Sequence, residues 1–520
     1  MLEEIWDEPH DLEPHLRELV QREFVRLRTG PETTVCAFAH ALTHEVAYRS
    51  LFDETRRRVH ERVARALASR FPQVTETQPE LLAHHYTNAG LAGPAVKHWL
   101  RAGQQARARS AYTEAISHLT QGLEGLTALP ESRERTDLEI ELQLALGSSL
   151  GAIKSFGSPG VGQAYRRAQD LAREIGQSSR LFDALAGLQT RDFVRGELGR
   201  AQELASQCLT LADYSGEPSV LYRSSNAMGG VLVHVGEPAS AQEHLERAIA
   251  LVEADKSRPF PHRPSVFHPL VFALSYNSWA LWLLGYPDQA LHVSESALTT
   301  AESLDQPLSR ALAWHYANVL RQLRREEGFI LVQADALAAL ASEHGFQHFS
   351  ALALVMGGWA VAERGDLAQG AAQIRQGLDA YRDTGTGLGR PYFLGLLAAV
   401  YARTGRRREA VEVLAEAIAL GQERNERAWE AELQRQTGEV LLAEPAADVD
   451  QAKRHFQQAI AIARAQGARA WELRAALSLT RLGGSPDERK MLHDVYDRFT
   501  EGRDTRDLAE AREFFAFEAA

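Results

Sequence analysis

The sequence predicts an all-α chain built from repeated pairs of helices. Apolar residues recur at three- and four-residue spacing in segments such as 181–194 and 410–420, as on one face of a helix. Alanine and leucine dominate these segments, and no strand-like alternation of apolar and polar residues follows residue 50. A pattern of glycine, two small residues and an aliphatic residue also recurs, which indicates an internal repeat.

The composition is that of a folded, soluble protein. Of the 520 residues, 45% are hydrophobic and 24% are charged. The formal net charge of -12 argues against nucleic acid or an anionic membrane as the main partner, because both favour excess positive charge. Cys36 and Cys208 supply neither a disulfide framework nor a zinc motif. Without a transmembrane run or a signal peptide, a cytoplasmic protein with no cofactor is expected.

The N-terminal segment differs from the rest of the chain. Leu12, Leu16 and Leu19 mark a short amphipathic helix. Residues 24–27 and 35–38 are expected to form two brief strands around Gly30 and Pro31.

The repeat is clearest in the middle of the chain. The turn glycines follow one another at intervals of 40, 49, 80 and 40 residues: Gly196, Gly236, Gly285, Gly365 and Gly405. Glycine ends a helix readily because it adopts the left-handed backbone conformation without steric penalty. The small residues that follow let the neighbouring helix approach closely. Such a pair cannot bury its apolar face alone, so we expect a solenoid whose contacts are mostly between adjacent repeats.

This pattern resembles the tetratricopeptide repeat (TPR). The residues that carry the resemblance are Leu394, Leu397, Ala398 and Tyr401 in one helix and Ala410 and Leu414 in the next. They match the family's W-x2-L-G-x2-Y and A-x3-F pattern with aliphatic substitutions. The period is about 40 residues rather than about 34, which implies longer helices, and the copy at 324–338 is degenerate. The resemblance implies a right-handed superhelix of about seven to nine repeats.

Three further segments resemble a larger bacterial architecture. Residues 38–51 resemble the end of the winged-helix domain that follows the nucleotide-binding domain of STAND-class signalling ATPases. Residues 78–86 resemble the linker into their TPR arrays, and residues 495–502 fit the end of those arrays. Nearly the whole chain is similar to the C-terminal half of bacterial proteins that fuse an adenylate or guanylate cyclase, a STAND ATPase and a TPR superhelix. A small winged-helix remnant at the N-terminus is therefore implied.

The catalytic parts of that architecture are absent from the sequence. It contains no G-x4-G-K-[S/T] motif and no Gly-Lys pair, so the lysine and loop that bind the β- and γ-phosphates are missing. We expect a non-catalytic fragment that senses a ligand or partner for signal transduction, with an upstream ATPase or cyclase as its partner. Two alternatives stay open. The chain is part of an ATPase or cyclase whose catalytic domains lie outside it, or it is the TPR region of a transcriptional regulator.

Three motifs suggest chemistry, and a structural interpretation is favoured for each. His40 and His44 lie four residues apart on an expected helix, yet no third metal ligand is evident. His84 and His85 are adjacent and would face different sides of a helix. Residues 385–390 contain three glycines but follow no expected strand, so they are interpreted as a loop between repeats. No metal site is expected.

The inner face of the superhelix is the candidate binding site. In TPR arrays the first helix of each pair lines a concave groove, and such surfaces bind partners. Counting back from the turn glycines places nine residues there: Arg223, Asn226, Phe272, Trp279, Trp282, His315, Trp359, Tyr392 and Arg403. Aromatic rings flanked by arginine and asparagine suit a protein, a peptide or a small effector. The alternative is that these rings fill space between long helices.

The expected organisation has four segments. Residues 1–75 form the partial winged-helix-like segment and a linker helix, and residues 76–180 the first TPR-like repeats. Residues 181–480 form the superhelix with a period of about 40, and residues 481–520 its capping helices.

Overall fold

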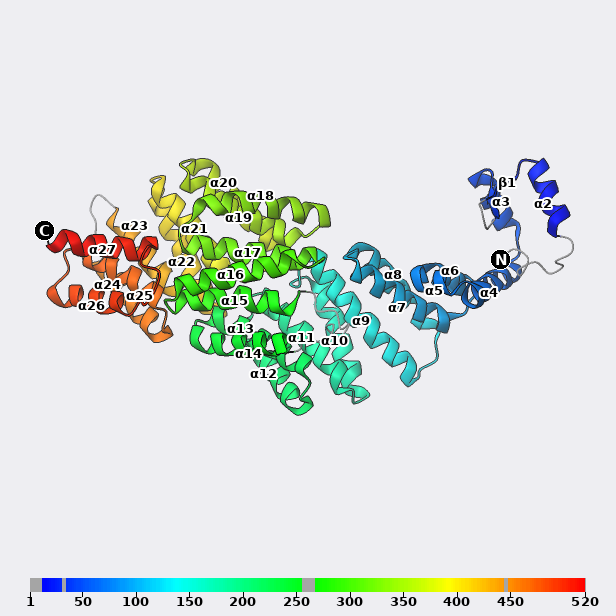
Figure 1. The fold of residues 1–520 in the computed structure, drawn as a ribbon, viewed down its shortest axis with the longest axis horizontal. Helices are drawn as coiled ribbons and strands as arrows, with labels where there is room; N and C mark the ends of the chain where they lie inside the picture. The colour runs from blue at the N-terminus through cyan, green and yellow to red at the C-terminus, as the bar shows by residue number, and fades with distance from the viewer. Residues whose placement is uncertain (1–11, 30–33, 255–266, 444–447, 520) are drawn as a thin grey trace. The chain divides into compact units, whose positions relative to one another are not determined.

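The computed structural model describes residues 12–29, 34–254, 267–443 and 448–519. Within these ranges the chain is helical apart from connecting segments and one two-stranded sheet, which confirms the predicted all-α class. The chain divides into two compact units, Met1–Leu146 and Gly147–Ala520, and the division falls inside helix α9 (Figure 1). The finer boundaries expected at residues 75, 180 and 480 stay predictions.

The described part of the first unit begins with helix α2 and a strand pair and continues as packed helices. Strands β1 and β2 pair antiparallel with Val25 opposite Phe38, which confirms the two predicted strands. Gly30 and Pro31, expected between them, lie outside the described residues. The helical core of this unit includes Val96, Leu119 and Leu142. Its elements are α2 (Leu12–Gln21), β1 (Val25–Thr29), β2 (Thr34–Phe38), α3 (Ala41–Ser50), α4 (Asp53–Arg70), α5 (Pro72–Thr77), α6 (Pro79–Asn88), α7 (Ala92–Ala108), α8 (Tyr112–Gly125), the 3-10 turn η2 (Leu126–Ala128) and α9 (Arg133–Lys154).

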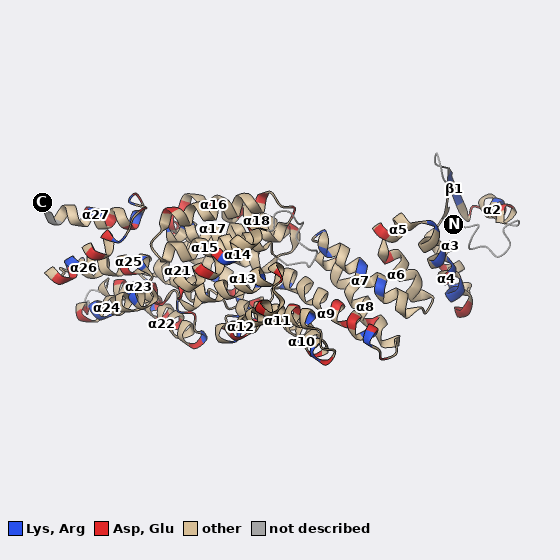
Figure 2. Cartoon of the chain, turned by 60° about the horizontal axis from the view of Figure 1, so that its bottom comes forward, with Lys and Arg blue, Asp and Glu red and all other residues tan. Residues whose placement is uncertain are grey.

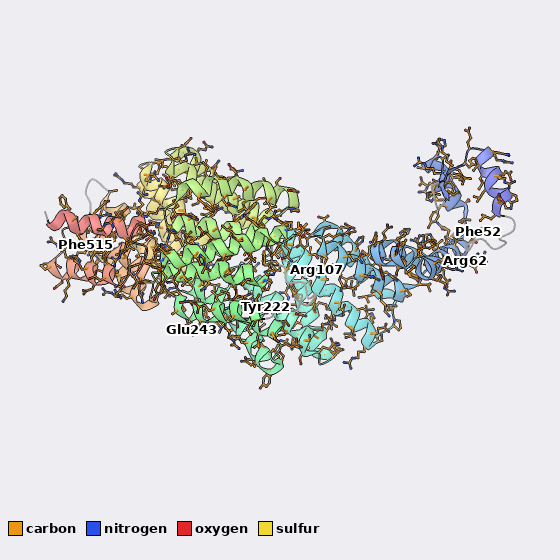
Figure 3. The ribbon with its side chains drawn as sticks, in the orientation of Figure 1. Phe52, Arg62, Arg107, Tyr222, Glu243 and Phe515 are labelled. Atoms are coloured by element: carbon orange, nitrogen blue, oxygen red, sulfur yellow. The ribbon has the colours of Figure 1, made fainter. Side chains whose placement is uncertain are left out.

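Large apolar side chains are exposed around the strand pair and helices α3 and α4. Phe52, labelled in Figure 3, has 84% of its surface exposed, Leu42 71% and Val46 62%. Folded proteins rarely leave several large apolar side chains uncovered so close together in the sequence. This part of the first unit therefore has apolar surface to offer a further packing partner.

The second unit is an array of antiparallel helix pairs. In Figure 1, α15, α17 and α19 lie side by side, as their mutual contacts require. Its helices are α10 (Pro159–Glu174), α11 (Ser178–Val194), α12 (Leu198–Ser215), α13 (Pro218–Val235), α14 (Pro238–Ala254), α15 (Pro269–Leu283), α16 (Pro287–Glu302), α17 (Pro307–Leu323), α18 (Glu327–His344), α19 (Gln347–Glu363), α20 (Leu367–Asp383), α21 (Arg390–Arg403), α22 (Arg407–Arg424), α23 (Glu430–Leu442), α24 (Val449–Gln466), α25 (Arg469–Thr480), α26 (Pro486–Asp497) and α27 (Arg506–Ala519).

The repeat pattern has the structural causes expected from the sequence. Gly236, at the turn between α13 and α14, has φ 91°, a left-handed conformation that costs other residues steric strain. A Cβ atom on Gly229 would lie 2.6 Å from Cγ of Leu245, so a small residue is needed for α13 to approach α14. The small residue Ala248 is fully buried on the same helix as Leu245. The expected degenerate copy at 324–338 still forms a complete helix pair, α17 and α18.

Contacts in the second unit are mostly between adjacent repeats, as expected, but some also join repeats far apart in the chain. The hydroxyl of Thr386, between α20 and α21, lies 2.8 Å from the hydroxyl of Ser155, 231 residues earlier. The backbone N–H groups of Gly387 and Leu388 both donate to the carbonyl of Val194, at 3.0 and 3.1 Å. Successive turns of the array therefore touch, and later repeats cover the inner face of earlier ones.

The surface carries charges of both signs along most helices (Figure 2). A basic cluster is visible on α4, whose arginines include Arg56 and Arg65, paired with Asp53 and Glu61 respectively. Among the described residues, no helix combines the length and the apolar character needed to cross a bilayer.

Candidate functional site

The two tryptophans predicted for the inner face lie in the interior of the second unit. Trp279 is 3% exposed, donates from Nε1 to the carbonyl of Tyr316 at 3.0 Å and packs against Trp429, with ring centroids 5.9 Å apart. Trp282 is also 3% exposed, and its ring meets that of Trp471 edge to face at 4.7 Å. Trp429 and Trp471 come from later repeats, so both predicted tryptophans are covered by the next turn.

Tyr392 and His315 are buried as well. The hydroxyl of Tyr392 donates to Oε1 of Gln322 at 2.6 Å, and its ring packs on Trp429 at 4.6 Å. The Nδ1 atom of His315 is buried without a hydrogen-bond partner. Burial, followed by the charges of His348 and His234, lowers the pKa of His315 to about 3. A neutral imidazole is therefore expected there at physiological pH.

The other five predicted residues have separate surroundings. Arg223 forms an ion pair with Asp183 at 2.7 Å. Asn226 donates to the carbonyl of Pro269 at 3.0 Å, which ties α13 to the start of α15. The remaining contacts are as follows: Phe272 packs on Tyr276 with centroids 4.7 Å apart, Trp359 is 5% exposed, and Arg403 is exposed and paired with Glu363.

The inner face is thus a layer of interior contacts. Trp279 and Tyr392 both pack against Trp429. Arg223 and Arg403 instead form separate ion pairs, with Asp183 and Glu363 respectively. Such contacts are typical of residues that fill space between helices. This was the alternative to ligand binding that the sequence left open. Ligand binding by the nine residues stays a prediction.

The glycine-rich segment and the His40–His44 pair both have a structural explanation. Residues 385–389 form the end of the connection from α20 to α21, which begins at Arg390, so this segment is a loop between repeats, as interpreted from the sequence. His40 precedes α3 as its N-cap residue, and the ring of His44 stacks on Tyr48 with centroids 6.1 Å apart. No three potential ligands gather into a metal site in the part of the chain that the structure describes.

A histidine cluster in the first unit joins residues far apart in sequence. Nδ1 of His60, on α4, lies 2.9 Å from Nδ1 of His85, on α6, and His60 Nε2 lies 2.9 Å from the hydroxyl of Tyr48. The ring of His84 is 5.8 Å from that of His60. Burial, followed by the charges of His60 and His84, lowers the pKa of His85 to about 4. The expectation that His84 and His85 face different sides of their helix was wrong, because both rings lie near His60, at 5.8 and 5.0 Å. No local pattern links α4 to α6, so the approach of His60 could not be predicted from the sequence.

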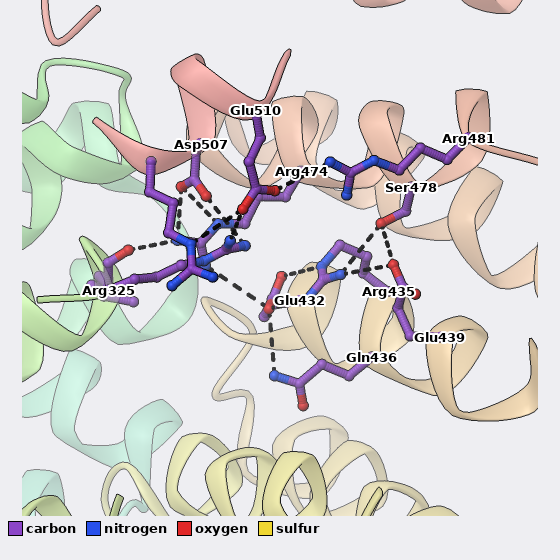
Figure 4. Close-up of polar contacts among 12 residues, drawn as sticks. Arg325, Glu432, Arg435, Gln436, Glu439, Arg474, Ser478, Arg481, Asp507 and Glu510 are labelled. Atoms are coloured by element: carbon purple, nitrogen blue, oxygen red, sulfur yellow. Dashed lines mark hydrogen bonds and ion pairs between the residues drawn. The ribbon is translucent and has the colours of Figure 1, made fainter. Parts of the chain in front are cut away.

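Sequence reasoning also missed a group of paired charges at the C-terminal end of the array (Figure 4). Arg474, on α25, is 7% exposed at its side chain and binds Asp507 of α27, with Nη2 2.7 Å from Oδ2. Arg325, in the turn between α17 and α18, lies 2.9 Å from Glu510. On α23, Arg435 holds Glu432 at 2.7 Å. Burial acts to raise the pKa of Asp507, but the charges of Arg474 and Arg325 outweigh it and lower that pKa.

A signal for this site does exist in the repeat spacing. Residue 325 lies 40 positions after Gly285 and 40 before Gly365, so the sequence pattern calls for a glycine where Arg325 stands. Arg325 adopts the left-handed conformation of those glycines, with φ 61°. A non-glycine residue that keeps this conformation is a reason to examine what its side chain does.

Comparisons with known proteins bear on the fold. No family model matches the sequence. An uncharacterized protein of Rhizobium meliloti (strain 1021) is 26% identical over 461 residues, which cover 87% of this chain and 44% of that relative. The chain thus spans less than half the length of this curated relative.

Of two solved structures that match the chain, the first is similar in fold. The Rap protein complexed with Competence and Sporulation Factor matches 71% of this chain and 98% of its own, with 13% identity and a TM-score of 0.53. The Cut9-Hcn1 hetero-tetramer of the APC/C matches 96% of each chain with 14% identity and a TM-score of 0.44. The likeness to the Rap protein concerns the fold alone. The chain has an all-α, TPR-like helical-repeat fold with a small N-terminal strand pair.

Proposed function

We propose that this chain is the non-catalytic, partner-binding region of a bacterial STAND-type signalling protein. The observation that carries the proposal is the TPR-like array itself, because extended helical-repeat surfaces serve mainly to bind other proteins. The Rap protein of similar fold is complexed with Competence and Sporulation Factor, which gives such binding a precedent. The missing phosphate-binding lysine supports a role without ATP hydrolysis.

The N-terminal segment supports the second half of the proposal. Residues 38–51 resemble the end of a STAND winged-helix domain, and the structure leaves Leu42, Val46 and Phe52 of this region largely exposed. Apolar side chains at these positions suit a contact with the rest of such a domain. Engagement of the array by a ligand or partner would then bias the ATPase, a coupling between two sites.

The test starts with the DNA upstream of Met1, where an in-frame or adjacent P-loop ATPase identifies the expected partner. The purified chain is then titrated into that ATPase by calorimetry, and ATP hydrolysis is followed with and without it. Saturable binding with a changed hydrolysis rate supports the proposal. Saturable ATP hydrolysis by the chain alone would overturn the non-catalytic role.

Two exposed phenylalanines supply a matched pair of variants. Phe52→Ser changes a side chain with 84% of its surface exposed in the N-terminal segment, and Phe517→Ser changes one with 83% exposed on α27. Neither substitution removes a core contact, so both variants should fold. Phe52→Ser is expected to weaken binding to the ATPase by about tenfold, whereas Phe517→Ser leaves it unchanged. Equal effects of both substitutions would contradict a contact through the N-terminal segment.

A further inference from the structure

The last helix, α27, is seated on the array through two adjacent faces. On its apolar face, Leu508 is 1% exposed and Ala511 is fully buried. Phe515, labelled in Figure 3, stacks its ring on His493 of α26 with centroids 3.8 Å apart. On the neighbouring face, Asp507 and Glu510 lie one helical turn apart and point at the arginines drawn in Figure 4. The helix therefore combines an apolar anchor with a pair of carboxylates.

The arginines that receive these carboxylates come from two places in the array, the α17–α18 turn and α25 with its C-cap residue. Arg474 contacts Asp507 through Nε at 2.8 Å as well as through Nη2. Arg325 reaches both acids, at 3.2 Å from Asp507 and 2.9 Å from Glu510. Arg481 lies 3.4 Å from Glu510. Side chains gathered from the α17–α18 turn and from α25 thus converge on the two acids of one helix.

The charges balance only while α27 is in place. Glu432 contacts Arg435 at 2.7 Å and Arg474 at 3.9 Å, and Glu439 contacts Arg435. The ion pairs of Arg325 and Arg481 are with Asp507 and Glu510 of α27. When α27 leaves, Arg325 and Arg481 lose their carboxylates, and Arg474 keeps only its longer contact with Glu432. A cluster of guanidinium groups without counter-charge binds carboxylates strongly, because each pair is charge-assisted and directional.

Arg325 shows that the arginine cluster is built at a cost to the backbone. A glycine would relieve the strain of its left-handed conformation, and glycine occupies the equivalent turns at Gly285 and Gly365. The array keeps an arginine at this turn, where its side chain reaches Asp507 and Glu510. The strain is therefore tied to the docking of α27.

The junction under α27 has no room for a further ligand. Two small cavities, each of about 20 Å³, flank the helix, and Asp507 and Leu473 line both of them. Each holds about one water molecule, which is too little for a nucleotide or another organic anion while α27 stays in place.

We propose that α27 is a displaceable latch over a site that binds an acidic amphipathic helix of a partner protein. The partner helix presents two carboxylates one turn apart to Arg325, Arg474 and Arg481, and it places apolar residues where Leu508, Ala511 and Phe515 now lie. A helix fits better than a free anion because Leu508 and Ala511 of α27 pack in one apolar cluster with Leu492, Val495 and Phe499, which a free anion would leave uncovered. The proposal deepens the partner-binding role proposed above and relies on it only for the existence of an outside partner.

The first test uses the unmodified full chain and a synthetic peptide with the sequence of residues 503–519. Hydrogen exchange is followed by mass spectrometry as the peptide is added in excess. The amides of α27 are expected to lose protection while those of α25 keep it, since the peptide replaces α27 on the same site. A peptide with Asp507→Asn and Glu510→Gln should have no effect. If α27 exchanges only when α25 does, α27 is part of the core and the latch is ruled out.

The second test measures peptide affinity by fluorescence anisotropy for full-chain variants. Asp507→Asn with Glu510→Gln weakens the latch, and this variant should bind the peptide at least about tenfold tighter than the natural chain because less competition remains. The matched control, Asp504→Asn with Glu513→Gln, changes two exposed acids near the site and should bind as the natural chain does. Equal affinity of all three proteins would overturn the proposal.

A third variant keeps the test independent of folding and of the signalling role. Arg325→Gly restores the glycine of the equivalent turns, so the fold should tolerate it. Added to the latch-weakened variant, it should reduce peptide affinity by about tenfold. If inorganic phosphate or ATP binds the latch-weakened variant and the peptide does not, the site is an anion site and the helix proposal fails. Peptide binding without any effect on an ATPase would instead contradict the STAND role alone.

Discussion

Nδ1 of His234, in the last turn of α13, lies 3.0 Å from Oε1 of Glu426, in the connection between α22 and α23, although 192 residues separate them in sequence. The same carboxylate oxygen accepts the backbone N–H of Gly389 at 2.8 Å and Nε1 of Trp429 at 3.2 Å. The carbonyl of His234 in turn accepts the N–H of Ala428 at 3.1 Å. Glu426, 1% exposed, therefore joins two successive turns of the array.

Replacement of Glu426 should test how strongly this contact holds the turns together. Glu426→Ala leaves the buried donors of Gly389 and Trp429 without an acceptor, and a loss of about 3–5 kcal/mol in the free energy of unfolding is expected. Glu426→Gln keeps an acceptor oxygen and should cost less. Urea unfolding followed by circular dichroism measures both, with exposed Glu423→Ala as the control. A cost below 1 kcal/mol for Glu426→Ala would contradict a structural role.

The buried His315 predicts that stability falls as the pH is lowered below neutrality. Its pKa is about 3 in the folded chain, against about 6.5 when unfolded, so between these values the unfolded chain binds the extra proton. The free energy of unfolding therefore falls with decreasing pH, by an amount that approaches about 1.4 kcal/mol per pH unit between pH 6 and pH 5. Most carboxylates are still ionised in this interval.

The variant His315→Leu removes this titration. It should show a shallower decline in the free energy of unfolding over the same interval, although His85 and His348, with pKa values lowered to about 4, keep the slope above zero. Urea unfolding at half-unit pH steps provides the measurement. Identical slopes for the two proteins would show that His315 does not carry the effect.

Asn318 offers a stabilising substitution. It is fully buried in α17, and neither its Oδ1 nor its Nδ2 has a hydrogen-bond partner. The positions 40 residues earlier and later are Ser278 and Gly358, so the repeat accepts a small residue there. Asn318→Ala is expected to raise the free energy of unfolding by about 1 kcal/mol, because it removes unpaired buried polar groups. Asn318→Asp, of equal size but charged, should lower it; the opposite order in thermal melts would refute this account.

Trp279 should behave as a core residue in a stability assay. Trp279→Ala is expected to cost about 3–5 kcal/mol because the ring is buried against Tyr316 and Trp429. Trp279→Phe should cost less, and Tyr214→Ala, at a side chain 87% exposed on α12, should be neutral. Ligand binding by Trp279 is best tested with the phenylalanine variant, since loss of binding by the alanine variant would coincide with loss of folding. Retained stability of Trp279→Ala would favour the groove interpretation.

Local physics made the helix pairs predictable. Gly236 ends a helix because its φ is positive, and Gly229 permits close packing because a side chain would collide with Leu245. Both requirements act within one repeat, so a single sequence displays them as a spacing. The strand pair at residues 25–38 was predictable for the same reason.

The candidate site was less predictable because its contacts join distant repeats. The sequence places Trp282 on an inner face but does not show that Trp471, from a later turn, covers it. The arginine site was hidden in the same way, since Arg325 meets Glu510 across 185 residues. Its only local sign is an arginine where the repeat calls for glycine.

The bond between Thr386 and Ser155 restricts how this protein can change in length. Many repeat proteins gain or lose internal units by duplication or deletion, because each unit meets only its neighbours. Here one inserted pair of helices would shift every later turn out of step with the turn beneath it, and the partners of Ser155, Val194 and His234 would all be displaced together. We therefore expect new units to be tolerated only beyond either end of the part of the array in which successive turns touch. Within that part, the number of helices per turn determines which residues meet, so it cannot change without loss of these contacts.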